Sequence, residues 1–179
     1  DVMAYLRLLT NSSDDNALLR IINTPRRQIG PTTLEKLGEY ANQRGIGLYA
    51  AIDELGLAAQ LPAANLERLK TFKQWLDNAR RAAFGDQPMA AVRELLEDID
   101  YLSWLHQNAS SSKVAEKRWE NVNLLLSQLE QVMERESEEE FGDSFNEQLD
   151  DGDSQIEKAV TKLVLRDMLD RMDELGKDL

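Results

Sequence analysis

The chain has 179 residues, a formal net charge of -12 at pH 7 and no cysteine. This length is enough for one large domain or two small ones with a real hydrophobic core. Without cysteine, the chain forms no disulfide framework and no thiolate metal site, and its strongly negative charge argues against a general nucleic-acid binder.

The negative charge is concentrated in the C-terminal third of the chain. Residues 1–120 carry 15 Lys and Arg against 16 Asp and Glu, a net charge of -1, whereas residues 121–179 carry 6 against 17, a net charge of -11. The first two thirds of the chain are therefore nearly neutral, and a local basic face is compatible with them.

The hydrophobic pattern predicts an all-α fold, because no stretch alternates apolar and polar residues as a half-buried strand does. A first helix begins near Val2, and Asp14 is placed to cap a second. Thr24-Pro25 ends the second helix, since the residue before proline is pushed out of the helical region. The third helix runs from Pro31 to about Arg44, and Gly45-Ile46-Gly47 follows as a plain interhelical turn.

The rest of the chain continues the helical pattern. Apolar residues recur every three or four positions from Leu66 to Ala83, which predicts a long amphipathic helix. Two shorter helices follow around Val92 and Tyr101, and another long helix begins near Lys113. A final helix is expected over about 160–175.

An acidic segment separates the last two helices. From Glu134 to Glu157 there are eleven acidic residues and one basic residue. Such a run repels itself and has little to bury, which predicts a mobile or disordered acidic loop at about 136–156. A solvated linker is the simpler interpretation; the alternative is a mimic of nucleic-acid phosphates that competes for a basic surface.

Residues that support catalysis are scarce. His106 is the one histidine and has no metal-ligating partner at helical spacing, so no metal site is expected. No phosphate-binding glycine-lysine loop of the P-loop type is present. Trp75, Trp104 and Trp119 are typical of core or interface anchors. We therefore expect neither catalysis by this chain nor a cofactor bound to it.

The most informative segment is a short loop with two arginines, Arg26 and Arg27, followed by a Gly30-Pro31 step. Glycine permits unusual backbone angles, and proline suits the first position of a helix. The next amides, at Thr32 and Thr33, have no intrahelical partner and lie at the positive end of the helix dipole, which binds anions. Two interpretations remain open, a phosphate clamp for a nucleic-acid backbone and an ordinary turn with solvated arginines. The residues alone favour the turn.

Segments 2–11, 14–22 and 23–30 together resemble the 2B subdomain of bacterial superfamily 1A DNA helicases, the group of Rep, UvrD and PcrA. Within this group, segments 90–93, 100–105, 117–123 and 165–168 resemble the Rep type most. The resemblance covers the whole chain except the acidic loop. It implies that residues 1–179 form a single helical subdomain inserted in the second motor domain, with its two ends close together.

The resemblance also implies a function. The parent protein is expected to be a bacterial cytoplasmic helicase that uses ATP and Mg²⁺ to move 3′ to 5′ on DNA, with all ATPase motifs in other domains. The 2B subdomain swivels between open and closed states, contacts duplex DNA at a fork or junction, and restrains or permits unwinding. Its expected partners are duplex DNA and the other domains of the parent, not a membrane.

By position, the resemblance assigns the contact with DNA phosphates to Thr24, Arg26, Arg27, Gly30, Thr32 and Thr33. UvrD-like members carry Gly-Ile-Gly where this chain has Gln28-Ile29-Gly30, so close backbone approach at position 28 is in doubt. With the resemblance, the phosphate clamp becomes the favoured interpretation. Weaker candidates for a second DNA contact are Lys113, Lys117 and Arg118, although Arg118 can equally serve the helical core. The alternative function is a protein-interaction module acting through the acidic loop or exposed aromatic residues.

Overall fold

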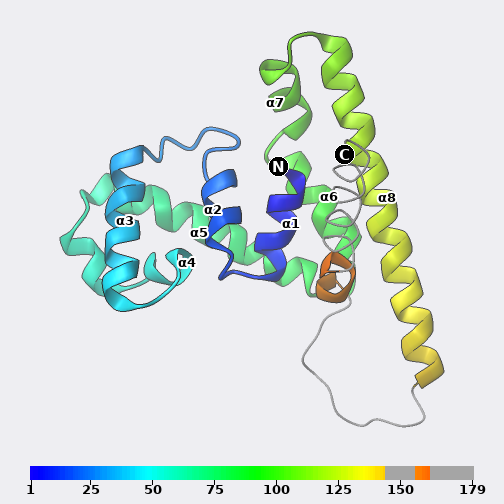
Figure 1. Ribbon diagram of the computed structural model, residues 1–179, viewed down its shortest axis with the longest axis horizontal. Helices are drawn as coiled ribbons and strands as arrows, with labels where there is room; N and C mark the ends of the chain where they lie inside the picture. Colours follow the sequence, from blue (N-terminus) through cyan, green and yellow to red (C-terminus); the bar gives the residue numbers. More distant parts are fainter. Residues whose placement is uncertain (144–155, 162–179) are drawn as a thin grey trace, which may run out of the picture.

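The computed structural model describes residues 1–143 and 156–161, with side chains for 1–135 and 156–161. Every regular element in these ranges is a helix, which confirms the predicted all-α fold (Figure 1). The elements in chain order are α1 (Val2–Thr10), α2 (Asp15–Ile21), α3 (Pro31–Arg44), α4 (Leu48–Ala51), the 3-10 helix η1 (Leu55–Ala59), α5 (Ala63–Ala83), α6 (Pro88–Asp98), α7 (Tyr101–Asn108) and α8 (Ser112–Asp143). Residues 156–161 are also helical.

Local signals in the sequence set the ends of the first three helices. The Asp14 carboxylate accepts a hydrogen bond from the amide of Ala17 (3.1 Å), so Asp14 caps α2 as predicted. Helix α3 begins at Pro31 and ends at Arg44, the bounds expected from the sequence. Gly45 follows α3 with a φ of 64°, a left-handed conformation that glycine adopts at low cost.

The turn between α3 and α4 is held by α2. The carboxylate of Asp15 accepts a hydrogen bond from the amide of Leu48 (3.0 Å), which is the first residue of α4. The N-terminal end of this four-residue helix is thus occupied by a side chain of the protein itself. This contact supports the interpretation of residues 45–47 as a plain interhelical turn.

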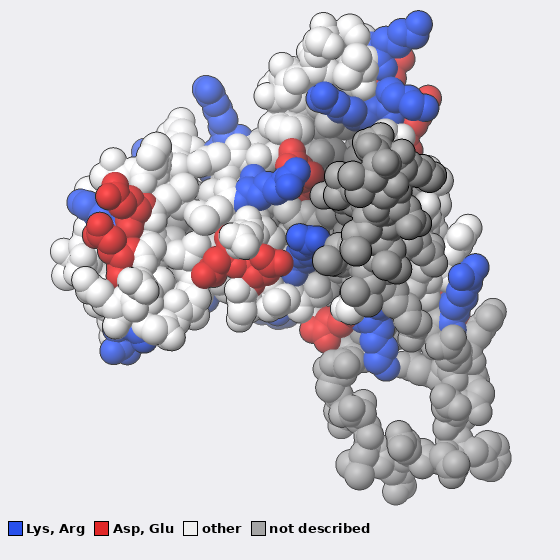
Figure 2. Space-filling model, in the orientation of Figure 1, with Lys and Arg blue, Asp and Glu red and all other residues white. Residues whose placement is uncertain are grey.

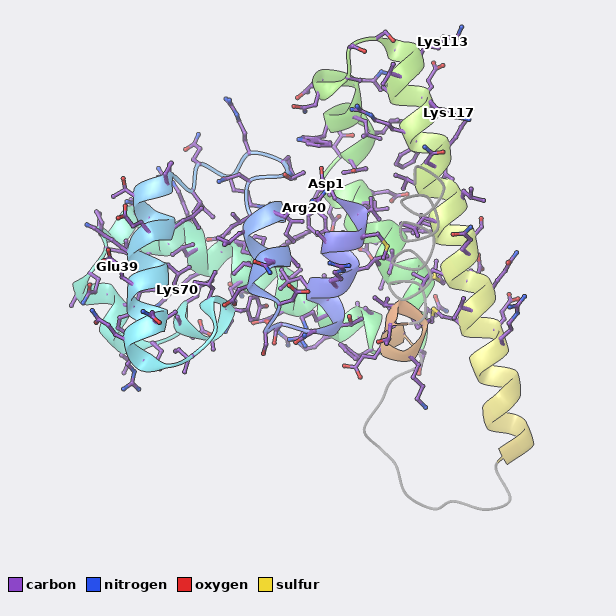
Figure 3. The ribbon with its side chains drawn as sticks, in the orientation of Figure 1. Asp1, Arg20, Glu39, Lys70, Lys113 and Lys117 are labelled. Atoms are coloured by element: carbon purple, nitrogen blue, oxygen red, sulfur yellow. The ribbon has the colours of Figure 1, made fainter. Side chains whose placement is uncertain are left out.

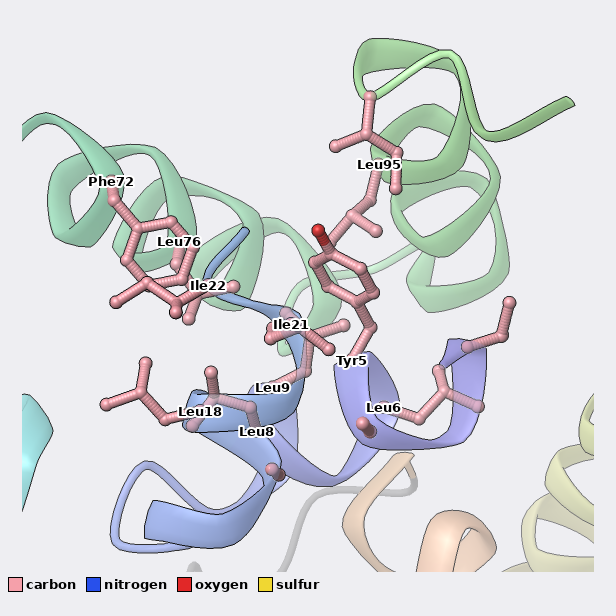
Figure 4. Close-up of a cluster of buried hydrophobic side chains, with 14 of the residues drawn as sticks. Tyr5, Leu6, Leu8, Leu9, Leu18, Ile21, Ile22, Phe72, Leu76 and Leu95 are labelled. Carbon is pink, nitrogen blue, oxygen red and sulfur yellow. The ribbon is translucent and has the colours of Figure 1, made fainter. Parts of the chain in front are cut away.

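Helix α5 packs against α1, α6 and η1, and it is longer than each of them. Side chains of α1 and α2 meet α5 and α6 in one buried cluster (Figure 4). Burying a leucine, isoleucine or phenylalanine side chain fully stabilises a fold by roughly 1.5–3 kcal/mol. The largest of the completely buried side chains include Tyr5, Leu6, Leu8, Leu9, Leu18, Ile21, Ile22, Leu69 and Leu76.

Helices α7 and α8 form a hairpin that projects from the helices packed around α5 (Figure 1). Helix α8 continues through Asp143, so the prediction of a loop beginning at residue 136 is wrong for residues 136–143. Glutamate has a good intrinsic helix propensity, and the run 138–140 consists of glutamates that extend the preceding helix. The rest of the predicted acidic loop up to residue 155 and most of the predicted final helix lie outside the described residues. The end of the chain lies there too, so its expected proximity to the start stays a prediction.

Residues 156–161 contribute to the core, because the side chains of Ile156, Ala159 and Val160 are buried. Over residues 1–143 and 156–161, none of the helices has both the length and the apolar character that crossing a lipid bilayer requires.

Candidate nucleic-acid interface

The segment between α2 and α3 is an irregular loop whose backbone is held by Asn23. The side-chain amide of Asn23 donates to the carbonyl of Ile29 (2.6 Å), and its oxygen accepts from the amides of Ile29 (3.3 Å) and Arg27 (3.4 Å). These bonds join the two ends of the loop, while the Ile29 side chain is buried in the core. One asparagine thus fixes the path of a loop that has no regular secondary structure.

Asn23→Ala should lower the free energy of unfolding by about 1–2 kcal/mol, because it leaves the backbone groups of Ile29 without their partners. Denaturant unfolding followed by circular dichroism measures the change. Asn78→Ala is the matched control, since Asn78 is exposed and its one hydrogen bond to the described residues is accepted from Arg81. The control should stay within about 0.5 kcal/mol of the parent. Equal effects of the two substitutions would contradict the role given to Asn23.

Arg27 points into the protein. Its Nη1 donates to the carbonyls of Ile21 (2.8 Å) and Ile22 (3.1 Å) at the end of α2, and its Nη2 donates to the hydroxyl of Tyr5 (2.8 Å). The guanidinium carbon lies 4.8 Å from the ring centroid of Phe72 and 5.2 Å from that of Trp75, so it also makes cation–π contacts with α5. Arg27 therefore connects the loop with α1, α2 and α5.

The surroundings of Tyr5 complete this connection. The Tyr5 hydroxyl donates to the carbonyl of Thr24 and is itself the acceptor for Arg27. Burial raises the pKa of Tyr5, and the positive charge of Arg27 opposes that rise. Burial therefore favours the neutral hydroxyl, which is the form that donates to Thr24.

Three of the residues predicted to contact phosphate, Arg27, Thr24 and Thr33, are engaged or buried within the protein. Arg27 is a structural residue, because its guanidinium is already engaged with carbonyls, a hydroxyl and two aromatic rings. The Thr24 hydroxyl donates to the carbonyl of Arg20, and its own carbonyl accepts from Tyr5. The whole Thr33 residue is 5% exposed, so little of its side chain or of its backbone amide is accessible to a phosphate.

The other predicted contacts, Arg26, Gly30 and Thr32, remain candidates for binding a phosphate. Arg26 and Thr32 are exposed, and neither side chain has a hydrogen bond or ion pair within the described part of the chain. Gly30 is the N-cap of α3, which receives no side-chain cap, and the first intrahelical bond goes from Leu34 to Gly30. The amides of Thr32 and Thr33 therefore have no acceptor within the helix, and of these two residues Thr32 is the exposed one.

The conformational reason given for Gly30 is wrong. Gly30 has a φ of -78° and a ψ of 169°, which any residue adopts. The left-handed position is Gln28, with a φ of 57°. A glycine would adopt this conformation with less strain than glutamine. This difference accounts for the first glycine of the Gly-Ile-Gly pattern that UvrD-like members are expected to carry at residues 28–30. The backbone at position 28 thus has the glycine-like conformation despite its side chain.

Arg68 could not be recognised from the sequence. This residue of α5 reaches the loop, where its Nη1 donates to the carbonyl of Gln28 (3.5 Å). The same Nη1 also donates to the side-chain oxygen of Asn65, which lies on α5 (3.3 Å). Forty positions separate Arg68 from Gln28, and neither belongs to a recognisable motif with the other. Only the packing of α5 under the loop brings them together.

A groove of about 650 Å³ lies beside the loop. Its floor includes Phe72 and Trp75, and its walls carry charges of both signs. The lining residues that are charged are Arg27, Glu67, Arg68 and Asp98. The two arginines and two carboxylates of this lining balance in formal charge.

The second predicted contact group lies apart from the loop. Lys113 and Lys117 project from the N-terminal end of α8, on the hairpin formed by α7 and α8 (Figure 3). Lys117 makes an exposed ion pair with Glu120 (3.7 Å), while Lys113 and Arg118 are exposed. Figure 2 shows basic side chains at this hairpin and separate acidic side chains over α3. In the described part of the molecule, no hydrogen bond or ion pair connects this group with the loop.

The aromatic residues give little support to a protein-interaction surface. Trp75, Trp104 and Trp119 are partly buried and pack against the core, as the sequence predicted. His106 is exposed. Among the described residues, Phe84 is the aromatic one of the exposed large hydrophobic side chains, at 37% exposure, and the guanidinium carbon of Arg80 lies 5.9 Å from its ring centroid.

Comparison with known proteins identifies the relatives of this chain. Residues 1–166 match the family model of the UvrD-like helicase C-terminal domain. The chain is 42% identical over 171 residues to the ATP-dependent DNA helicases Rep of Salmonella typhimurium and Escherichia coli, which is 96% of this chain but 23% and 24% of those proteins. It is 36% identical over 126 residues to a probable DNA helicase II homolog of Rickettsia conorii, covering 70% of this chain and 19% of that protein. The chain thus spans about a quarter of the length of the Rep relatives.

Proposed function

Because the chain belongs to the family of UvrD-like helicase C-terminal domains, we propose that it is the 2B subdomain of a Rep-type DNA helicase. In this proposal it contacts duplex DNA at a fork or junction and regulates unwinding, and it catalyses nothing itself. ATP and Mg²⁺ are bound by other domains of a parent helicase that moves 3′ to 5′ in the bacterial cytoplasm. The similarity to Rep along 96% of this chain supports the choice of the Rep type.

The observation that carries the DNA contact is the exposed start of α3 beside Arg26. Arg26 supplies a positive charge that is unpaired among the described residues, and the amide of the exposed Thr32 supplies a donor at the positive end of a 14-residue helix. A Cβ atom added to Gly30 would have no heavy atom within 4 Å, so open space lies in front of this backbone. A sugar–phosphate backbone can therefore approach the start of α3 closely.

This surface supports weak binding. Two or three phosphate contacts release few counterions, and each contributes a log–log salt slope of roughly -0.9. The net charge of -12 opposes the approach of any polyanion. Weak contact suits a regulatory module, because DNA that binds one orientation of the subdomain better shifts the open–closed equilibrium by only that difference in affinity.

The proposal predicts salt-dependent binding to a forked duplex. The chain should bind a fluorescently labelled fork barely detectably at physiological salt and more tightly as salt is lowered, with a log–log slope of roughly -2 to -3. Fluorescence anisotropy measures the affinity, and a single strand of the same length and label is the control. The proposal would be overturned by a lack of binding at low salt, or by equal binding of the single strand.

A further inference from the structure

Arg68 lies on α5 and contacts the loop that carries Arg26, at Gln28, two residues after Arg26. Its guanidinium is held against the loop by the carbonyl of Gln28 and the side chain of Asn65. Gln28 has a φ of 57°, and this left-handed step sets the direction of its carbonyl. The unusual conformation of the loop and the position of Arg68 are therefore part of one arrangement.

Most of the hydrogen-bonding capacity of Arg68 is unused. A guanidinium has five N–H donors, and both of the bonds made by Arg68 start from Nη1. Among the described residues, its Nε and Nη2 make no hydrogen bond, and a pair of such donors matches two oxygens of one phosphate. Arg68 is exposed, so a ligand can reach these donors without any rearrangement of the core.

Arg68 differs in its charge balance from three other arginines of the surface. Arg20, Arg44 and Arg93 are each paired with a carboxylate, at 2.9, 3.4 and 3.2 Å. No carboxylate among the described residues lies within 4 Å of the guanidinium nitrogens of Arg68. Its positive charge is therefore not neutralised by an ion pair, as is also true of Arg26.

We propose that Arg68 is a second phosphate-binding arginine of the interface, which contacts the DNA backbone next to the phosphate held by Arg26 and the start of α3. This inference rests on the proposed function, because it assigns a further residue to the same DNA contact. It also gives Gln28 a purpose, since its carbonyl holds Arg68 in place on the loop.

The test compares the salt dependence of fork binding for the parent chain, Arg26→Gln, Arg68→Gln and Lys70→Gln. Lys70 is the matched control, because it is exposed on the same helix as Arg68. It comes two positions after Arg68, which places it on nearly the opposite side of the helix axis. Arg68→Gln should weaken binding at low salt by about threefold to tenfold and make the log–log slope shallower by about 0.9. Lys70→Gln should leave both quantities close to those of the parent.

The outcomes separate the inference from the proposed function. If Arg26→Gln reduces the slope and Arg68→Gln behaves like Lys70→Gln, the role of Arg68 is refuted and the proposed function stands. Loss of affinity in Arg68→Gln with an unchanged slope would also refute it, because a residue that only holds the loop neutralises no phosphate. If none of the substitutions changes affinity or slope, the proposed interface itself is wrong.

Discussion

Arg27→Met should destabilise the fold by about 3 kcal/mol and lower the melting temperature by roughly 6–12 °C. Methionine fills part of the same volume but cannot donate to the carbonyls of Ile21 and Ile22 or to the hydroxyl of Tyr5. Leaving half-buried acceptors without a donor costs about 1–3 kcal/mol, and the lost cation–π contacts add about 0.5–1 kcal/mol. Calorimetry or chemical denaturation measures the loss.

The neighbouring arginine provides the control for this prediction. Arg26→Met should change the free energy of unfolding by no more than about 0.5 kcal/mol, because Arg26 is exposed and makes no described polar contact. Arg27→Lys should recover only part of the stability, since an ammonium group cannot reproduce the planar fork of a guanidinium. Similar stabilities of Arg26→Met and Arg27→Met would show that the network around Arg27 contributes little.

Arg26→Glu is expected to have the largest effect on DNA binding while leaving the fold intact. Reversing this charge removes a charge-assisted contact and places a carboxylate beside a phosphate, so affinity for a forked duplex at low salt should fall by at least about tenfold, or about 1.4 kcal/mol. The salt slope should also become shallower by about 0.9. Anisotropy titrations at several salt concentrations measure both quantities.

Arg81→Glu is the matched control for this charge reversal. It produces the same total charge as Arg26→Glu, but Arg81 lies near the far end of α5, 13 residues from Arg68 and about 20 Å along the helix. Its effect on binding should therefore be limited to the small general repulsion from a more negative chain. Equal weakening by the two substitutions would mean that net charge, and not a local contact at the loop, governs binding.

These two predictions separate a pair of adjacent arginines that look equivalent in the sequence. Arg26 and Arg27 share residue type and loop, and a joint substitution of both would confuse loss of a DNA contact with loss of stability. The difference arises because one side chain points to solvent and the other reaches Tyr5 on α1 and two rings on α5. A sequence alone does not contain this information, since the partners of Arg27 lie up to 48 positions away.

The all-α fold and the bounds of α3 could be predicted from the sequence by itself, because the signals that set them act through neighbouring residues. These signals are the helix periodicity, the Asp14 cap of α2, and the proline and glycine at the two ends of α3. The position of the candidate site could be predicted for the same reason, since a free helix start after a short loop is a local feature. The tertiary structure alone decided which residues of that loop remain available. It turned Arg27 inward, gave Gln28 the left-handed conformation and brought Arg68 of α5 to the loop, because packing joins groups that are distant in the chain.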